Sequence, residues 1–359
     1  MTMIAAFSSL GMPALIGDFL VTRNGVDDGT IKKIVILHER LALGHAGQLI
    51  SIKSVMRALL EWVKVTSVSK ATLHEFLTSE GMALHGDGQP FVCILVGWVV
   101  DLDGTQNCFR WRSDYPSEVF YGDPMYEGSG GSDAEALLRD GPTVPPNEVD
   151  DVDEHLMRVC VCNAAMALMS EELRPSGKCR DAYGFAFEAI IFQDGAFRYL
   201  SSNSLHYLVD IEYGENGGLE YIGVNLSVIY VRSGENFTEV VKAQIGPAQQ
   251  EFHLIGPAVV SEAEMKNESA LMNQRHANGV DWSYTLGLEW MNIGVAGRTL
   301  PPLYITREPP QHNFSFDGSK IDWAPDLGQI EAIVPIMLTD LAAGEPQMSS
   351  SKTEEPSGP

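Results

Sequence analysis

Short apolar runs separated by turn residues dominate the first fifty positions of the chain. Runs at 3–7 and 14–21 predict one pair of strands, and runs at 33–37 and 41–43 predict a second pair. The second pair ends in the glycine-containing stretch 44–47. This pattern is typical of strands joined by short turns, and it predicts that the N-terminal segment lies in β-sheet.

The apolar period then changes to steps of three and four residues. Between positions 52 and 63 the apolar residues Ile52, Val55, Leu59 and Val63 share one face, which predicts an amphipathic helix. Helical character continues over 72–78. A third helix is predicted over 152–173; it is apolar almost all round from Leu156 to Met169, so we expect it to be buried between layers.

Two further hairpins are predicted before position 201. Runs at 91–101 and 107–112 meet across Asp103-Gly104, and runs at 181–189 and 196–200 meet across Asp194-Gly195. From about residue 202 the pattern is strand-like, with one helical candidate at 261–274. Three parts are therefore expected: a mixed domain over 2–201, a β-rich accessory domain over 202–341, and a polar, disordered tail over 342–359.

Composition narrows the classes of partner. The 359 residues include 24 Lys and Arg against 48 Asp and Glu, a net charge of -24. Nucleic acid and anionic membranes both need a cationic footprint, so neither is an expected partner. The longest apolar run, 91–100, is about half a membrane span. The absence of a basic segment before the first apolar run argues against a secretory signal, so we expect a cytoplasmic protein.

The cysteines add no site to this picture. The 5 cysteines are odd in number and mostly in apolar contexts, which is typical of buried free thiols in a reducing compartment. Cys160 and Cys162 lack a second pair at metal spacing. No metal and no cofactor are expected.

The residue with the clearest chemical potential is Thr2. Methionine aminopeptidases remove an initiator Met before a small residue, and removal of Met1 would give Thr2 a free α-amino group. The pKa of such an amine is about 8, low enough for part of it to be a neutral base at cellular pH. A hydroxyl and a base on one residue make a self-contained acyl-transfer nucleophile.

Further motifs follow Thr2 in a characteristic order. They are Gly17-Asp18, Lys33-Ile34, Gly44-His45-Ala46-Gly47, Gly128-Ser129-Gly130-Gly131 and Asp181-Ala182-Tyr183-Gly184. In order and spacing, over about residues 2–200, they resemble proteasome β-type subunits and the peptidase subunit of the bacterial ATP-dependent two-component protease. These proteins are N-terminal-nucleophile (Ntn) hydrolases.

The resemblance implies a fold, an activity and partners. The fold would be of the α+β class, a four-layer αββα sandwich carrying the β-rich region as an appendage. The activity would be that of a threonine protease cleaving amide bonds, most plausibly in peptides. Relatives assemble into rings, so the implied partner is the chain itself as a homo-oligomer. The roles implied are nucleophile for Thr2, electrostatic activation for Lys33, support of Lys33 for Asp18, oxyanion binding for the Gly47 N–H, and orientation of the amine for Ser129 and Asp181.

Other interpretations stay open. Phe19, Leu20 and Gly184 depart from the family pattern. A catalytically inactive scaffold or binding protein and a small-molecule amidohydrolase of the same fold are the two alternatives. Asp18 and Lys33 would then be a structural ion pair, and the 44–47 glycines a strand-to-helix turn. His45 is expected at the surface or in a capping position.

Overall fold

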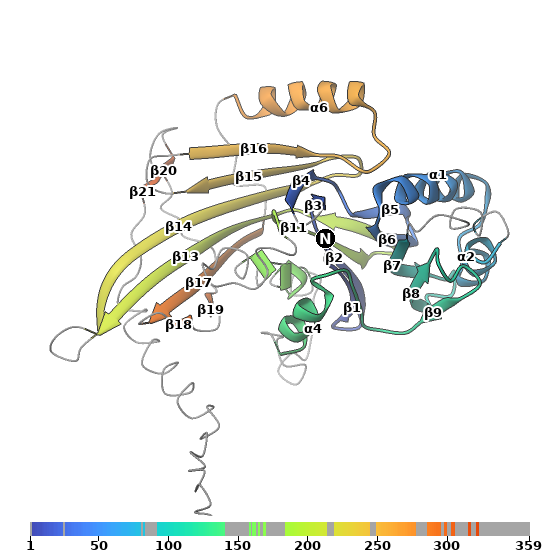
Figure 1. The fold of residues 1–359 in the computed structure, drawn as a ribbon, viewed down its shortest axis with the longest axis horizontal. Helices are drawn as coiled ribbons and strands as arrows, with labels where there is room; N and C mark the ends of the chain where they lie inside the picture. The colour runs from blue at the N-terminus through green and yellow to red at the C-terminus, as the bar shows by residue number, and fades with distance from the viewer. Residues whose placement is uncertain are drawn as a thin grey trace, which may run out of the picture.

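The fold is taken from a computed structural model of the whole chain (Figure 1). The structure describes residues 2–23, 26–79, 82, 92–140, 158, 160–162, 164–165, 168–169, 184–213, 219–244, 249–277, 286–295, 298–299, 303–305, 315–316 and 321–322. Within these ranges the protein mixes helices with several antiparallel sheets, which confirms the α+β class. No described helix is both long and apolar enough to cross a bilayer.

The first sheet is built around the N-terminal hairpin. It is five-stranded and antiparallel, in the order β10-β1-β2-β11-β12. Its strands are β1 (Ile4–Ser9), β2 (Met12–Asp18), β10 (Met125–Glu127), β11 (Phe187–Gln193) and β12 (Ala196–Leu200). The β2–β11 pairing joins two hairpins that are far apart in sequence, with Asp18 opposite Phe187.

The second sheet follows the chain order. It is also five-stranded and antiparallel, in the order β5-β6-β7-β8-β9. Its strands are β5 (Ile34–His38), β6 (Leu41–Gly47), β7 (Cys93–Val100), β8 (Gln106–Arg112) and β9 (Val119–Tyr121). The predicted hairpin across Asp103-Gly104 is the β7–β8 pair.

These two sheets share one buried apolar cluster. It joins Ile4, Leu15 and Ile190 of the first sheet to Ala42, Val96 and Trp98 of the second. Two glycines let the sheets approach closely. A Cβ at Gly17 would lie 2.6 Å from Ile34 Cγ2, and one at Gly44 would lie 2.7 Å from Ile4 Cγ2.

Helices cover the second sheet on its other side. The 17-residue helix α1 (Leu49–Val65) and the shorter α2 (Lys70–Leu77) place Val55, Leu59 and Leu73 in one cluster with Leu43 and Trp111. Ser69 and Thr72 form a reciprocal capping box at the start of α2. Both helices lie beside β5–β8 in Figure 1. The steps of three and four residues therefore marked the face of α1 correctly.

A different set of helical residues contacts the first sheet. Helix α4 (Gly131–Asp140) lies against β1 and β10. The predicted helix 152–173 is described only in part, and the described residues between 158 and 169 are helical. Val161, Leu168 and Met169 are buried in one cluster with Met3 and Ile16. The expectation of a buried helix is confirmed for these residues.

The third large sheet lies after position 201. Its order is β16-β15-β14-β13-β17-β18, with β19 also paired to β17, and the β13–β17 pair is parallel. Its strands are β13 (Ser202–Tyr213), β14 (Leu219–Ser233), β15 (Thr238–Gln244), β16 (Gln249–Ile255), β17 (Leu286–Val295), β18 (Arg298–Thr299) and β19 (Leu303–Ile305). The two-stranded pairs are β3 (Leu20–Arg23) with β4 (Val26–Thr30), and β20 (Ser315–Phe316) with β21 (Ile321–Asp322).

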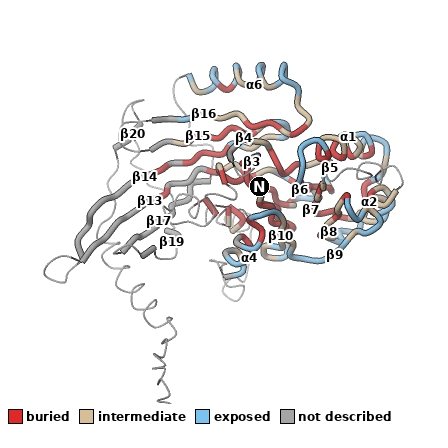
Figure 2. Tube along the Cα trace, in the orientation of Figure 1, coloured by how far each residue is buried: buried red, intermediate tan, exposed pale blue. Residues whose placement is uncertain are grey.

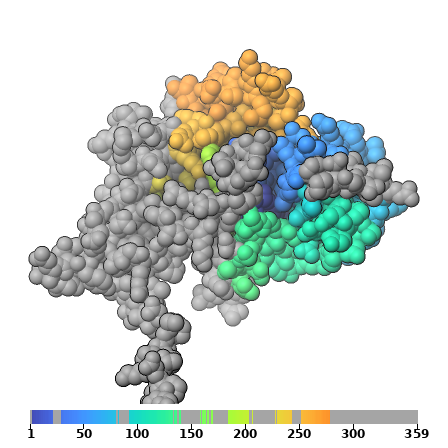
Figure 3. All heavy atoms as spheres, viewed as in Figure 1, coloured from blue at the N-terminus to red at the C-terminus, as the bar shows by residue number. Residues whose placement is uncertain are grey.

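The third sheet is packed onto the first. Ile229, Val231, Val240 and Ile255 belong to the cluster that contains Met3, Val161 and Leu168. Helix α6 (Glu262–Arg275) runs along the outside of β16 (Figure 1). Most of its residues are exposed or half-buried (Figure 2), and it forms the upper ridge of the surface in Figure 3.

Candidate functional site

Asp18 is the centre of a buried hydrogen-bond network. It is the last residue of β2 and has no exposed surface. Its Oδ1 accepts from Lys33 Nζ at 2.6 Å and from the Met3 N–H at 2.8 Å, and its Oδ2 accepts from the Gly184 N–H at 3.1 Å. The carboxylate therefore links three segments: Met3 before β1, Lys33 before β5, and Gly184 before β11.

Lys33 shares the burial of its partner. Its side chain is 3% exposed, and Nζ donates to Asp18 and, at 2.5 Å, to the Leu20 carbonyl. Burial lowers the pKa of the Lys33 ammonium and raises the pKa of the Asp18 carboxyl, while the ion pair acts against both changes. The two side chains stabilise each other's charge where water does not reach, so removal of either would leave a buried charge unpaired.

The 128–131 turn holds the backbone of Thr2 through two hydrogen bonds. The Thr2 N–H donates to Ser129 Oγ at 3.1 Å, and the Thr2 carbonyl accepts from the Gly130 N–H at 3.2 Å. Gly128 has φ of +94°, and a Cβ there would lie 2.0 Å from the Thr2 oxygen. Only glycine fits this turn next to Thr2 without displacing one of the two backbones.

The predicted site residues are thus partly assembled. Thr2, Asp18, Lys33 and Ser129 belong to one chain of contacts, which runs through the backbone of Met3. Asp181 lies outside the described residues. Its neighbour Gly184 contributes through the backbone, because its N–H binds Asp18 and its carbonyl accepts from Phe19 and Leu20.

Gly47 is the last residue of β6, and Gln48 separates it from α1. Its φ is +113°, and a Cβ would lie 1.9 Å from the Val92 carbonyl oxygen, so the position requires glycine. Gly44 on the same strand packs against Ile4 of β1. Gly47 takes no part in the hydrogen bonds given above for Thr2, Asp18 and Lys33.

His45 corrects one expectation. The side chain was predicted at the surface, but it is 2% exposed, and neither ring nitrogen has a hydrogen-bond partner among the described residues. The backbone N–H of His45 donates to the Lys33 carbonyl at 3.0 Å. Burial, with Lys33 close by, lowers the pKa of His45 to about 4. The ring is therefore neutral at pH 7. The prediction was wrong because the paired neighbour of His45 in β7 is the buried Leu95, which brings this strand position inside.

A second buried ion pair lies next to the first and was not predicted. Lys32 Nζ donates to Glu188 Oε1 at 2.8 Å, to Thr238 Oγ1 at 3.1 Å and to the Gly234 carbonyl at 2.5 Å. Lys32 and Glu188 are fully buried. Nζ also lies 3.7 Å from the centre of the Tyr199 ring. The one available signal was the pair of adjacent lysines in an acidic chain, but Glu188 and Thr238 are too distant in sequence to be assigned to it.

Consecutive lysines thus serve two different networks. The Lys33 side chain reaches Asp18 and the predicted site, whereas the Lys32 side chain reaches the turn between β14 and β15. Among the described residues no three His, Cys, Asp or Glu side chains are grouped as they would be in a metal site. The arrangement offers a buried Lys–Asp pair whose carboxylate binds the N–H of Met3, the residue next to Thr2 in the chain.

Comparisons with known proteins assign no family to this arrangement. No family model matches the chain, and no curated protein matches its sequence significantly. The function must therefore be argued from the site itself.

Proposed function

We propose that the chain is a threonine-type hydrolase of amide bonds, most plausibly of peptide bonds, with Thr2 as its nucleophile. The observation that carries the proposal is the single network from Thr2 through Met3 and Asp18 to Lys33, with Ser129 on the other side. The two facing sheets with helices outside them support a four-layer αββα Ntn sandwich as its fold. Cytoplasmic location and ring-like self-assembly are part of the same proposal.

The reaction would begin with removal of Met1, which turns the Thr2 N–H into a primary amine. Its neutral form accepts the hydroxyl proton while Thr2 Oγ1 attacks the amide carbonyl. The same proton then passes to the leaving amine, and water hydrolyses the resulting ester. Ser129 would keep the amine oriented through the contact that its Oγ makes with Thr2 N.

Lys33 would act electrostatically in this scheme. A cation near the hydroxyl stabilises the developing alkoxide, and burial strengthens that interaction. Asp18 holds the ammonium in place at 2.6 Å and is held in turn by two backbone N–H groups. The Gly47 N–H would bind the oxyanion.

The proposal is tested by intact mass and by covalent labelling. The mature protein should lack Met1, and a β-lactone probe should add once per chain at Thr2. Thr2→Ala, which still permits Met1 removal, should abolish labelling, while Thr105→Ala on an exposed turn should not. A retained Met1, or labelling that survives Thr2→Ala, would disprove the mechanism.

The Lys33 role needs a separate variant. Lys33→Met should lower the labelling rate by about 100-fold or more, the order expected for one preorganised electrostatic group. Lys64→Met is the matched control, because Lys64 pairs with Glu61 on the exposed face of α1. A folded wild-type protein that is never labelled would favour the inactive scaffold. Labelling together with turnover of acyl amides but not peptides would favour the small-molecule amidohydrolase.

A further inference from the structure

A cavity of about 830 Å³ lies where the third sheet meets the edges of the other two. Its walls come from β5, β12, the β14–β15 turn and the helical residues Arg158 and Cys162. Drug-sized ligand sites in proteins are commonly 300–1,000 Å³. The cavity is separate from the Thr2 network, because none of Thr2, Asp18, Lys33 and Ser129 lines it.

One wall of the cavity is apolar and partly aromatic. Phe197, Tyr199 and Leu200 of β12 line it together with Ile36 and Leu37 of β5. Tyr199 is fixed in place, since its hydroxyl accepts from the Ile36 N–H at 3.0 Å and its ring covers Lys32 Nζ. A flat or aliphatic body of a ligand would find a rigid surface here.

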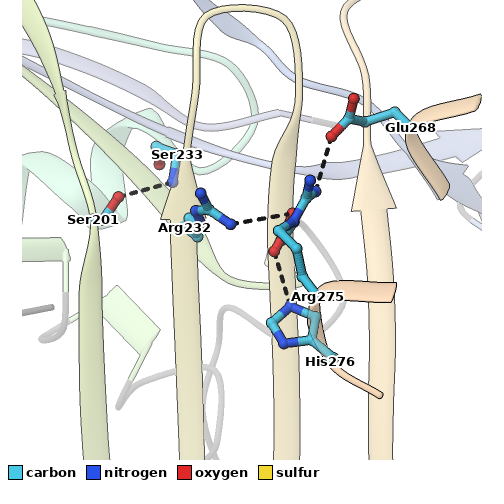
Figure 4. A network of polar contacts seen from close by, with 7 residues as sticks. Ser201, Arg232, Ser233, Glu268, Arg275 and His276 are labelled. Carbon is cyan, nitrogen blue, oxygen red and sulfur yellow. Dashed lines mark hydrogen bonds and ion pairs between the residues drawn. The ribbon is translucent and has the colours of Figure 1, made fainter. Parts of the chain in front are cut away.

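The remaining wall carries hydrogen-bond donors. Ser233 Oγ is buried and has no partner among the described residues. Ser201 Oγ accepts from the Ser233 N–H at 3.1 Å (Figure 4), which leaves its own hydroxyl hydrogen to donate. His38 Nδ1 accepts from the Arg40 N–H at 3.1 Å, so the neutral ring carries its proton on Nε2.

Cations add to these donors. Arg158 and Arg198 line the cavity, and the guanidinium of Arg198 lies as far as 3.9 Å from its nearest carboxylate, on Asp194. Two lining acids, Glu39 and Glu235, are exposed; Glu39 is 61% exposed and already lies 3.7 Å from Arg40 Nε. Arg198 is itself 53% exposed, so its charge, like that of the two acids, lies on the solvent side of the cavity beside the donors and the apolar wall.

We propose that this cavity binds a small amphipathic monoanion, such as an aromatic or aliphatic carboxylate, with its body on β12 and its anionic group near Ser233 and Arg198. The inference does not depend on the hydrolase activity. The turn that closes the cavity is the same turn whose Gly234 carbonyl is held by Lys32. Bound ligand would therefore also restrain the turn at 233–237.

The test uses two fluorescent probes that differ in charge. The sulfonate 8-anilinonaphthalene-1-sulfonate should bind the full-length protein saturably, one per chain, and octanoate should displace it. The uncharged N-phenyl-1-naphthylamine should bind at least about tenfold more weakly, as expected for the loss of one charge-assisted hydrogen bond. Hydrogen exchange at residues 234–237 should slow when the sulfonate is bound.

Substitutions of residues that line the cavity test where the ligand binds. Arg198→Glu reverses the charge and Ser233→Leu fills the donor wall, and each should weaken sulfonate binding at least about fivefold. Arg139→Glu is the matched control, because Arg139 is 65% exposed on α4, and it should bind as the wild type does. Arg198→Gln replaces Arg198→Glu if the reversal alters the circular dichroism spectrum. Equal affinity in all variants, equal affinity for both probes, or no saturable binding would overturn the proposal.

Discussion

At the scale of single residues, the sequence indicated which side chains matter but not all of their partners. Thr2, Asp18, Lys33 and Ser129 were expected together from the resemblance to Ntn hydrolases. Hydrogen bonds join Thr2 to Ser129 and Lys33 to Asp18, and Met3, which follows Thr2 in the chain, binds Asp18. Two of the donors to Asp18 are backbone N–H groups, on Met3 and Gly184, and no side-chain pattern marks a backbone group. The Lys32–Glu188 pair spans 156 positions and depends on how the sheets pack, so local patterns could not predict it.

His45 makes the stability of the protein depend on pH. Its folded pKa of about 4 lies below the ordinary 6.5, so the unfolded chain binds this proton first as pH falls. Stability contributed by the neutral ring is therefore complete above pH 6.5 and decreases from there to about pH 4, by roughly 3 kcal/mol.

The variant His45→Leu isolates this effect in urea unfolding at pH 7 and pH 4. Between pH 7 and pH 4 the free energy of unfolding of the wild type should fall by roughly 3 kcal/mol more than that of the variant, because leucine does not titrate. His74→Leu, at an exposed position of α2, should follow the wild type. Wild-type and His45→Leu curves that stay parallel across this range would contradict the prediction.

Gly128 permits a direct comparison of two glycines with similar backbones. Gly128 has φ of +94° and Gly104 has φ of +87°, but a Cβ at Gly104 would meet nothing within 4 Å. Gly104→Ala should therefore lower the free energy of unfolding only by the strain of a positive φ, about 1 kcal/mol. Gly128→Ala should lower the free energy of unfolding clearly more than Gly104→Ala does, and it should displace Thr2.

The measurements for this pair are urea unfolding and β-lactone labelling. Gly128→Ala should lose roughly 2 kcal/mol or more of unfolding free energy beyond Gly104→Ala, because its Cβ would overlap the Thr2 carbonyl oxygen, and it should be labelled much more slowly. If the two variants unfold alike and are labelled alike, the close approach of Gly128 to the Thr2 carbonyl has no consequence.

At the scale of elements, long periodic segments were predicted well and short polar ones were missed. The hairpins at β7–β8 and β11–β12 and the helix α1 follow the expected patterns. Strand β10 has only three residues, and β4 reads VDDGT, whose centre of two Asp and one Gly is disfavoured in strands. Both form because a partner strand supplies the hydrogen bonds, β1 in one case and β3 in the other. Tertiary context thus overrides weak local preference.

Helix α6 shows what holds an element without an apolar face. Met272 is its one buried residue, and its C-terminal end is tied to β15 through Glu239, which is 4% exposed. The Glu239 carboxylate contacts Arg275 and accepts from His276 Nε2 at 2.9 Å, and Arg275 also donates to Glu268 at 2.8 Å (Figure 4). The helix therefore depends on one carboxylate more than on apolar burial.

The change Glu239→Gln should loosen α6. An amide keeps the shape of the side chain but not its charge, so the contacts to Arg275 and His276 weaken and the helix opens more often. Amide hydrogen exchange in 262–275 should speed up about tenfold or more, while exchange in β14 and β15 changes little. Arg232→Met is the control, because Arg232 is 50% exposed and 3.8 Å from Glu239, and it should leave α6 protected. Unchanged exchange in α6 after Glu239→Gln would show that the carboxylate is not its anchor.

At the scale of the whole molecule, the predicted boundary at 201 and 202 falls across a shared core. Met3, Ile16 and Phe187 lie in one buried cluster with Ile229, Val231 and Val240. Lys32 likewise depends on Gly234 and Thr238 for two of its hydrogen bonds. Sequence patterns change at 202, but a change of pattern marks where a new sheet begins and not where a core ends.

A chain ended at residue 201 should therefore not fold as an independent domain. It would expose one side of this cluster and leave a fully buried lysine without two of its acceptors, and both changes are costly. We expect it to be insoluble, or expanded in its hydrodynamic radius, with unfolding that is no longer cooperative. The control chain ends at 341 and lacks only the polar stretch 342–359, and it should unfold as the full-length protein does. A compact 1–201 fragment with a cooperative transition would show that the first two sheets are self-sufficient and that the third is a separable addition.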